Sequence, residues 1–301
     1  MFHLYQREEI IRKDDNMSLE IIDVGNRFGS MNISSISVNN MSNADKFHLY
    51  AVKFGRIAND DSELTLEMKR AVFDRHREIM ANHYGIDAKK IFVADQEKKN
   101  GSSFLITRDF VEANPDGWKT SIPEDILITT DEVPGVVIGH PIADCPVVMA
   151  IDKKKGVAAI AHCSAELIDK KMPMMVVDAL QRACDSRDDE IVAYISACAG
   201  NDWTYDNYPR WATDRKLWDG AITLDNGVFR IDMRKVILNQ LAERNIKDMR
   251  FNMDNTRTNP NYYSNSMASP NGGNDPTKAG RNFAGVFFKP KYKEKVKFKE
   301  K

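Results

Sequence analysis

A cysteine and a histidine that could act together chemically stand at the ends of two neighbouring apolar segments. Cys145 lies just before the apolar run 147–151, and His162 follows the apolar run 156–161, with a short polar turn between the runs. This pattern is typical of two paired strands, and a hairpin would bring both side chains to one end of a sheet. A thiol and an imidazole at one place can form a nucleophile–base pair or half of a zinc site.

Each of these two residues also has a purely structural interpretation. Asp144 stands beside Cys145, and Pro146 fixes the backbone after it, but most free cysteines are buried structural thiols. His162 precedes a polar segment typical of a strand-end loop; it is either a structural histidine or a general base or metal ligand for the thiol. Cys163 would point to the other face of the strand, and we interpret it as a core residue.

Three further residues bear on the site. Cys198, at the exit of another apolar run, either lines the same cleft or packs in the core, and packing is favoured. Arg281 could bind an anion through its planar guanidinium, with a surface arginine as the alternative. His140, on the strand before Cys145, is expected to face the opposite side and is left out of the site.

Length and composition bound the class of protein. The 301 residues are enough for one large domain or two ordinary ones, and 42% hydrophobic with 29% charged residues is ordinary for a globular protein. The net charge of -1 gives no reason to expect nucleic acid or a membrane surface as partner. Four cysteines without a signal-peptide pattern or a membrane-length apolar run predict reduced thiols and a cytoplasmic location.

The order of elements favours an α+β or mixed-sheet α/β fold, because strands and helices mix without a strict βαβ rhythm. We expect a helix with Pro173 in its first turn and another capped by Asp232. Residues 264–278 are expected to form a lid or a disordered loop, and the lysine-rich residues 289–301 an edge strand or a frayed tail. The remaining predicted elements are a helix after 61–62 and strands at 91–94, 126–130, 136–139 and 191–195.

Two motifs resemble those of the laccase-domain or polyphenol oxidase family, whose members are also described as purine nucleoside phosphorylases. That family shows Thr-Ala-Asp-Cys-x-Pro and, one strand later, His-Ala-Gly-Trp-Arg-Gly. This chain keeps Ala143, Asp144 and Cys145 of the first motif, with Ile142 in place of the threonine and the proline one position early. Of the second it keeps His162, followed by Cys-Ser-Ala-Glu-Leu.

The resemblance covers roughly residues 45–288 and is strongest over 126–200. It implies a mixed-sheet α/β sandwich with flanking helices, a fold that has been grouped with cysteine hydrolases. It also implies a domain division of residues 1–44 as an N-terminal extension, 45–288 as the laccase-like domain and 289–301 as a basic tail. Weaker similarities lie at 127–135, 229–232, 259–264 and 280–281.

The resemblance also implies a zinc site made by Cys145, His162 and a histidine from an upstream Gln-x-His-Gly motif. Here Gln96 is kept, but Lys98 stands at the histidine position, and a protonated lysine cannot ligate zinc. If Lys98 lies near the thiol, it would favour the thiolate instead. The implied catalytic residues are Cys145, His162 and Asp144, and Gln96, Lys98 and Arg281 are candidates for substrate binding.

Three functions follow as hypotheses. The first is the metal-dependent purine nucleoside phosphorylase or deaminase that the resemblance implies, with a purine nucleoside and phosphate as small-molecule substrates. The second is a metal-free hydrolase or amidase with Cys145 as nucleophile, His162 as base and an oxyanion site made by strand-end amides. The third is a non-catalytic relative that binds a small ligand or a partner.

Overall fold

The computed structural model of the chain describes residues 9–11, 18–24, 27–28, 31–32, 78, 81, 86–94, 98–117, 122–152, 154–269, 272–275, 278 and 282–289. The helix predicted after residues 61–62, Gln96, Arg281 and the tail beyond Lys289 lie outside these residues.

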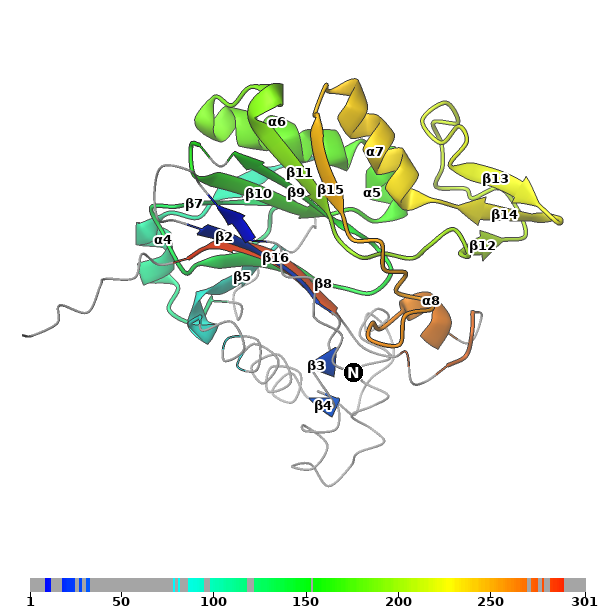
Figure 1. The fold of residues 1–301 in the computed structure, drawn as a ribbon, viewed down its shortest axis with the longest axis horizontal. Coiled ribbons are helices and arrows are strands. Elements are labelled where there is room, and N and C mark those ends of the chain that lie inside the picture. The colour runs from blue at the N-terminus through cyan, green and yellow to red at the C-terminus, as the bar shows by residue number, and fades with distance from the viewer. Residues whose placement is uncertain are drawn as a thin grey trace, which may run out of the picture.

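The chain forms three layers, with helices on one face of a six-stranded sheet and a five-stranded sheet on its other face (Figure 1). The six-stranded sheet has the order β15-β11-β9-β10-β7-β6, made of β6 (Ser103–Leu105), β7 (Ile126–Thr130), β9 (Val147–Asp152), β10 (Val157–His162), β11 (Ile191–Ile195) and β15 (Asp248–Phe251). The five-stranded sheet has the order β1-β2-β16-β8-β5, made of β1 (Glu9–Ile11), β2 (Ser18–Val24), β5 (Ile91–Val93), β8 (Val137–Ile142) and β16 (Asn282–Phe288). This mixed-sheet architecture confirms the predicted fold class.

Smaller elements complete the fold. A three-stranded sheet projects from one end of the molecule in Figure 1 and contains β12 (Thr204–Tyr205), β13 (Ile222–Asp225) and β14 (Val228–Ile231). The short strands β3 (Arg27–Phe28) and β4 (Met31–Asn32) pair with each other. The helices are η1 (Ala88–Lys90), α4 (Arg108–Ala113), α5 (Ala165–Asp169), α6 (Met172–Cys184), η3 (Asp188–Glu190), α7 (Met233–Glu243) and α8 (Asn265–Ala268).

The hairpin β9–β10 forms as the sequence predicts. The strands pair antiparallel from Val157 opposite Asp152 to His162 opposite Val147. The Asp152 carboxylate closes the turn by accepting the backbone N–H groups of Lys154 and Lys155, both at 2.9 Å. All six residues of β9 are buried, because helices cover one face of the sheet and the second sheet covers the other, so the strand reads as a continuous apolar run.

Two apolar cores result from this layering. The helix-facing core lies between α5, α6, α7 and the six-stranded sheet and includes Val148, Ala150, Ala161, Val177, Leu180 and Ile237. The inter-sheet core lies between the two large sheets and includes Ile138, Ile142, Val147, Met149, Ala158 and Ile160. Successive residues of β9 and β10 alternate between these two cores, as expected of a strand with both faces covered.

The helices begin and end close to the predicted residues. Pro173 lies in the first turn of α6, and the Asp232 carboxylate accepts the Lys235 backbone N–H at the start of α7. Asn245, just after α7, has φ of 57°, the left-handed conformation common at helix ends. Within the predicted loop 264–278, Ser264 caps the short helix α8. No helix in the described part of the chain is long and apolar enough to cross a membrane.

A buried carboxylate anchors the loop that contains Lys98. Asp125 is fully buried and accepts the backbone N–H groups of Lys99, Asn100 and Gly101 at 2.9, 2.7 and 2.8 Å. Three such bonds satisfy a buried carboxylate without a cation beside it.

We therefore expect Asp125→Ala to lower the free energy of unfolding by about 2–4 kcal/mol, since three buried amide donors lose their acceptor. Urea denaturation followed by circular dichroism measures this. Glu112, on the nearby helix α4, is exposed, so Glu112→Ala is the control that also removes a carboxylate, and it should change stability by less than about 0.5 kcal/mol. Equal stability of the two variants would contradict the anchoring role.

Candidate functional site

Cys145 follows a strained turn at which the chain passes from one large sheet to the other. Asp144 has φ of 84°, which is unusual for a residue with a side chain. Its carboxylate accepts the Thr256 hydroxyl at 2.8 Å and the Ser266 backbone N–H at 2.6 Å, and its carbonyl accepts the Ala199 N–H at 2.8 Å. Because both carboxylate oxygens are engaged, Asp144 is suited to positioning Cys145 rather than to proton transfer.

The register of the hairpin places Cys145 and His162 at the same end of the six-stranded sheet. His162 is paired with Val147, two residues after Cys145, and both side chains are half-buried. The Cys163 backbone N–H donates to the Pro146 carbonyl at 2.8 Å, which extends the pairing one step beyond the strands. Their placement is compatible with either chemistry that the sequence suggests, a nucleophile–base pair or a pair of metal ligands.

The expectation that His140 faces away from the site is wrong. The His140 and His162 rings lie 6.2 Å apart between centroids, and His140 is only 3% exposed. The expectation assumed that the strand of His140 continues into the strand after Cys145. Instead β8 belongs to the five-stranded sheet and β9 to the six-stranded sheet, so the side chain of His140 meets β10 across the layer between them.

The other two cysteines considered for the site pack in the helix-facing core. Cys163 and Cys198 are both fully buried, as the sequence predicts for Cys163 and favours for Cys198. Burial raises the pKa of the Cys163 thiol far above its ordinary value, and the nearby Cys145 sulfur adds to that rise. The Cys198 sulfur accepts a hydrogen bond from the Arg234 guanidinium at 3.5 Å. Although the guanidinium makes the surroundings of Cys198 electropositive, neither thiol has the exposure of a reactive cysteine.

The lysine at the family's histidine position is engaged elsewhere. Lys98 Nζ lies 2.5 Å from Glu124 Oε1, and this hydrogen bond is the largest cause that lowers the pKa of Glu124. The next residue, Lys99, pairs with Glu166 at 3.3 Å. Lys98 therefore neutralises a surface carboxylate, and the described contacts give no support to a role beside the Cys145 thiolate.

The described residues do not fit the three-ligand zinc site that the sequence resemblance implies. Cys145 and His162 are suitable donors, but in the ranges that the structure describes no three histidine, cysteine or acidic side chains gather as a metal site. Structural and catalytic zinc need at least three protein ligands in most proteins.

An aromatic cluster beside Cys145 was missed by sequence reasoning. Trp203 and Trp211 stack at 14° with centroids 6.1 Å apart, and Tyr205 lies 5.3 Å from Trp203. All three are half-buried. Burial raises the pKa of the Tyr205 phenol, the Trp211 hydrogen bond lowers it, and the nearby Cys145 sulfur raises it further. The phenol thus stays protonated, within electrostatic range of the thiol.

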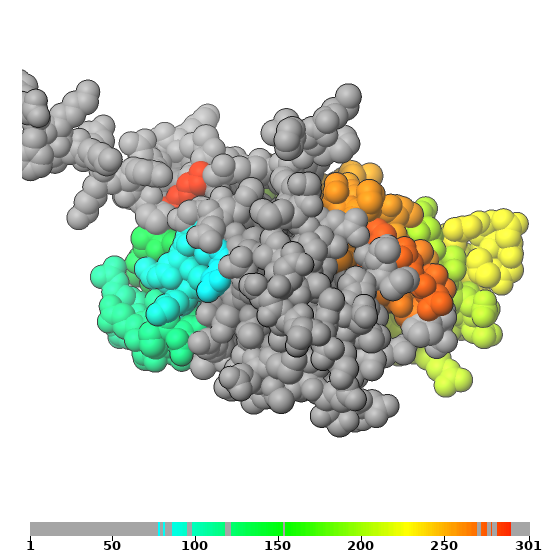
Figure 2. All heavy atoms as spheres, turned by 90° about the horizontal axis from the view of Figure 1, so that it is seen from below, coloured from blue at the N-terminus to red at the C-terminus, as the bar shows by residue number. Residues whose placement is uncertain are grey.

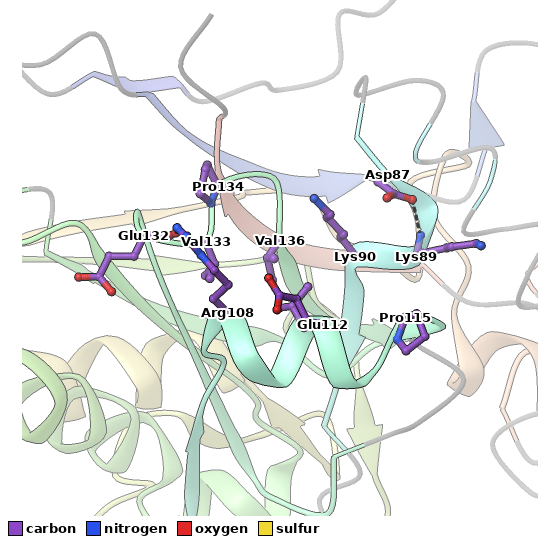
Figure 3. Close-up of a pocket in the computed structure, with 11 residues that line it drawn as sticks. Asp87, Lys89, Lys90, Arg108, Glu112, Pro115, Glu132, Val133, Pro134 and Val136 are labelled. Atoms are coloured by element: carbon purple, nitrogen blue, oxygen red, sulfur yellow. Dashed lines mark hydrogen bonds between the residues drawn. The ribbon is translucent and has the colours of Figure 1, made fainter.

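A separate surface cavity of about 550 Å³ lies at the other end of the sheets. It is lined by charged residues of η1 and α4 and by the turn before β8 (Figure 3), whereas Cys145 follows the end of β8, about 20 Å away along a strand of six residues. Figure 2 shows these segments at one end of the molecule and the segment around α8 at the other. Lys89 and Glu132 extend away from the cavity in opposite directions in Figure 3, so these two charges do not converge on a ligand.

Comparisons with known proteins agree with this fold. A family model described as multi-copper polyphenol oxidoreductase laccase matches residues 61–288. The solved structure of the hypothetical protein YfiH from Bacillus licheniformis is similar with a TM-score of 0.58 and 19% identity, over 73% of this chain and 81% of that chain. YlmD from Geobacillus stearothermophilus gives 0.60 and 14%, over 91% and 92%. Protein NMB0706 from Neisseria meningitidis gives 0.58 and 14%, over 95% and 100%.

At these identities the structural similarities show the fold alone. None of the curated proteins matches the sequence significantly.

Burial of His140 predicts a pH-dependent stability. Burial, together with the nearby His162, lowers the pKa of His140 from 6.5 to about 3. Between these values the unfolded chain binds a proton that the folded chain does not, so the stability present above pH 6.5 is lost as the pH falls. Going from about pH 7 to about pH 5, we expect His140 to contribute a loss of about 2 kcal/mol.

Urea denaturation at the two pH values checks this when the parent protein is compared with His140→Phe. The paired carboxylates contribute equally to both proteins, so the difference isolates the histidine. If both proteins lose the same stability between the two pH values, His140 is not held neutral by burial.

Proposed function

The chain belongs to the multi-copper polyphenol oxidoreductase laccase family, and we propose that it is a hydrolase of amide-type C–N bonds in which Cys145 is the nucleophile and His162 the general base. The observation that carries this proposal is the hairpin register, which sets His162 opposite Val147 and next to the turn of Cys145. A thiol held beside a base is activated by losing its proton to it.

The charge at the third ligand position favours this function over a metal-dependent one. The Lys98 ammonium is a donor without a lone pair and is engaged with Glu124. The family description names copper, so the membership alone favours a metal. Without a third metal ligand, Cys145 and His162 still supply the nucleophile and the base that a covalent mechanism needs.

The reaction then proceeds in two balanced steps. Cys145 Sγ attacks the carbon of the C–N bond while its proton passes to His162, and the imidazolium returns that proton to the departing nitrogen. Water, deprotonated by His162, then attacks the carbon that is bonded to sulfur, and Sγ recovers the proton from the imidazolium as the product leaves, an acid from an amide or a ring carbonyl from an aminopurine. The net reaction adds one water across the C–N bond.

The tyrosine hydroxyl of the aromatic cluster is an alternative to strand-end amides as the hydrogen-bond donor to the oxyanion. Several amides around Cys145 already have acceptors: Cys163 N–H donates to Pro146, Ala199 N–H to Asp144 and Val147 N–H to the Ser196 hydroxyl. The Tyr205 phenol stays protonated and interacts electrostatically with the Cys145 sulfur, so we consider it a better candidate donor to the developing oxyanion.

The aromatic cluster supports a substrate that carries a flat ring. Trp203, Tyr205 and Trp211 form a half-buried aromatic wall near the thiol, and aromatic side chains bind ring systems by stacking. A purine nucleoside, which the sequence resemblance implies, has such a ring, and its hydrolytic deamination would break a C–N bond.

We expect rapid alkylation of Cys145 by iodoacetamide at about pH 7, and we expect His162→Gln to slow it by about tenfold or more, because the base is lost. Mass spectrometry of the modified peptide identifies the thiol. Cys184→Ser is the matched control, since Cys184 is also half-buried but lies at the end of α6. The control should leave the Cys145 rate unchanged.

Metal analysis of the purified protein and turnover of inosine and adenosine in phosphate complete the test. We expect release of ammonia from adenosine without a stoichiometric metal, and no release in Cys145→Ala. Stoichiometric zinc or copper together with phosphate-dependent release of the base would overturn the proposal in favour of the metal-dependent phosphorylase. A thiol as unreactive as free cysteine would also overturn it.

A further inference from the structure

Two histidines from different sheets face each other at the edge of the inter-sheet core. His140 lies on the same face of β8 as Ile138 and Ile142, which are two residues before and after it. His162 lies on the same face of β10 as Ile160. These apolar neighbours all belong to the inter-sheet core. The pleat of each strand therefore directs both imidazoles into the same layer, where their ring centroids are 6.2 Å apart.

His140 occupies a position at which an apolar side chain would stabilise the fold better. It is 3% exposed, and its Nε2 has no hydrogen-bond partner among the residues that the structure describes. An unpartnered buried polar atom lowers stability, and such atoms in folded proteins call for an explanation, of which a role at a functional site is one. The neighbouring core positions of β8 are filled by isoleucine, so an apolar side chain fits this layer.

The charge state of His140 suits it to act on a second imidazole. Burial and His162 lower its pKa to about 3, so the ring is neutral over the working range of a Cys–His pair. A neutral imidazole offers one acceptor nitrogen and one N–H donor. It can therefore accept a hydrogen bond from an imidazolium, as a neutral third residue does in Cys–His–Asn sites.

We propose that His140 is the positioning residue of the site: its ring orients His162 and accepts the His162 ring N–H when His162 takes the proton of Cys145. This inference rests on the proposed function, because it requires His162 to act as a base. The ring centroids are 6.2 Å apart, and hydrogen bonds of catalytic groups commonly tighten only when substrate binds.

The described surroundings of His140 offer few other charged groups that could take this role. Across the sheet, its neighbour on β16 is Ala284, and the inter-sheet core around it is apolar. The carboxylate nearest in sequence, Asp144, is engaged with Thr256 and Ser266. A carboxylate, the usual third residue beside a catalytic histidine, is thus replaced by an imidazole.

Alkylation of Cys145 by iodoacetamide as a function of pH tests the proposal in the full chain. We expect His140→Phe to fold and to unfold at a temperature equal to or above that of the parent, because it fills the same space without a polar atom. In this variant the rate of Cys145 alkylation at about pH 7 should fall by about tenfold, the lower end of the effect of losing an orienting partner. The curve of alkylation rate against pH should also shift to higher pH. His140→Asn, which keeps an acceptor, should recover most of the rate.

Ile138→Val is the matched control, since it perturbs the same strand and the same core without touching an imidazole; it should leave the pH profile in place. An unchanged profile in His140→Phe overturns the inference. The proposed function fails separately, when His162→Gln also leaves alkylation unchanged. If His140→Phe does not fold, the ¹⁵N shifts of the parent protein decide: one fixed neutral tautomer of His140 supports the role, and free exchange between tautomers contradicts it.

Discussion

The left-handed turn at Asp144 is the constraint on which the rest of the site depends. A non-glycine residue in this conformation costs about 1–3 kcal/mol, and here three hydrogen bonds from Thr256, Ser266 and Ala199 hold it in place. The turn transfers the chain from β8 in one sheet to β9 in the other. It therefore fixes Cys145 at the end of the hairpin and, in the same step, folds the strand of His140 beneath the strand of His162.

The position of the site at the edge of the inter-sheet core explains its chemistry. Both large sheets bury apolar strands against each other, so the site lies beside a region of low polarity. Electrostatic interactions are stronger in such surroundings. Two groups that interact electrostatically with His162 and Cys145 are a neutral imidazole, His140, and a protonated phenol, Tyr205, which can donate or accept hydrogen bonds without imposing a charge.

Charged side chains around the loop 98–101 are matched locally. Lys98 pairs with Glu124, and Glu166 is held by Lys170 and Lys99. Exposed pairs of this kind contribute little to stability, but they neutralise the charges of these side chains locally. Glu166, which stands at the arginine position of the His-Ala-Gly-Trp-Arg-Gly motif, is thus neutralised by Lys99 and Lys170. Ser164, two residues before it, caps α5.

The sequence by itself determined the local structure: the β9–β10 hairpin, the starts of α6 and α7, and the inward direction of Cys163 all follow from apolar patterning and capping residues. It also identified Cys145 and His162 as residues at one sheet end. Only the tertiary structure decided that His140 belongs beside them, that Tyr205 lies near the thiol and that Lys98 turns to Glu124. The physical reason is that alternation fixes which face of a strand a side chain occupies, whereas the sheet that the strand joins depends on contacts between residues far apart in the chain.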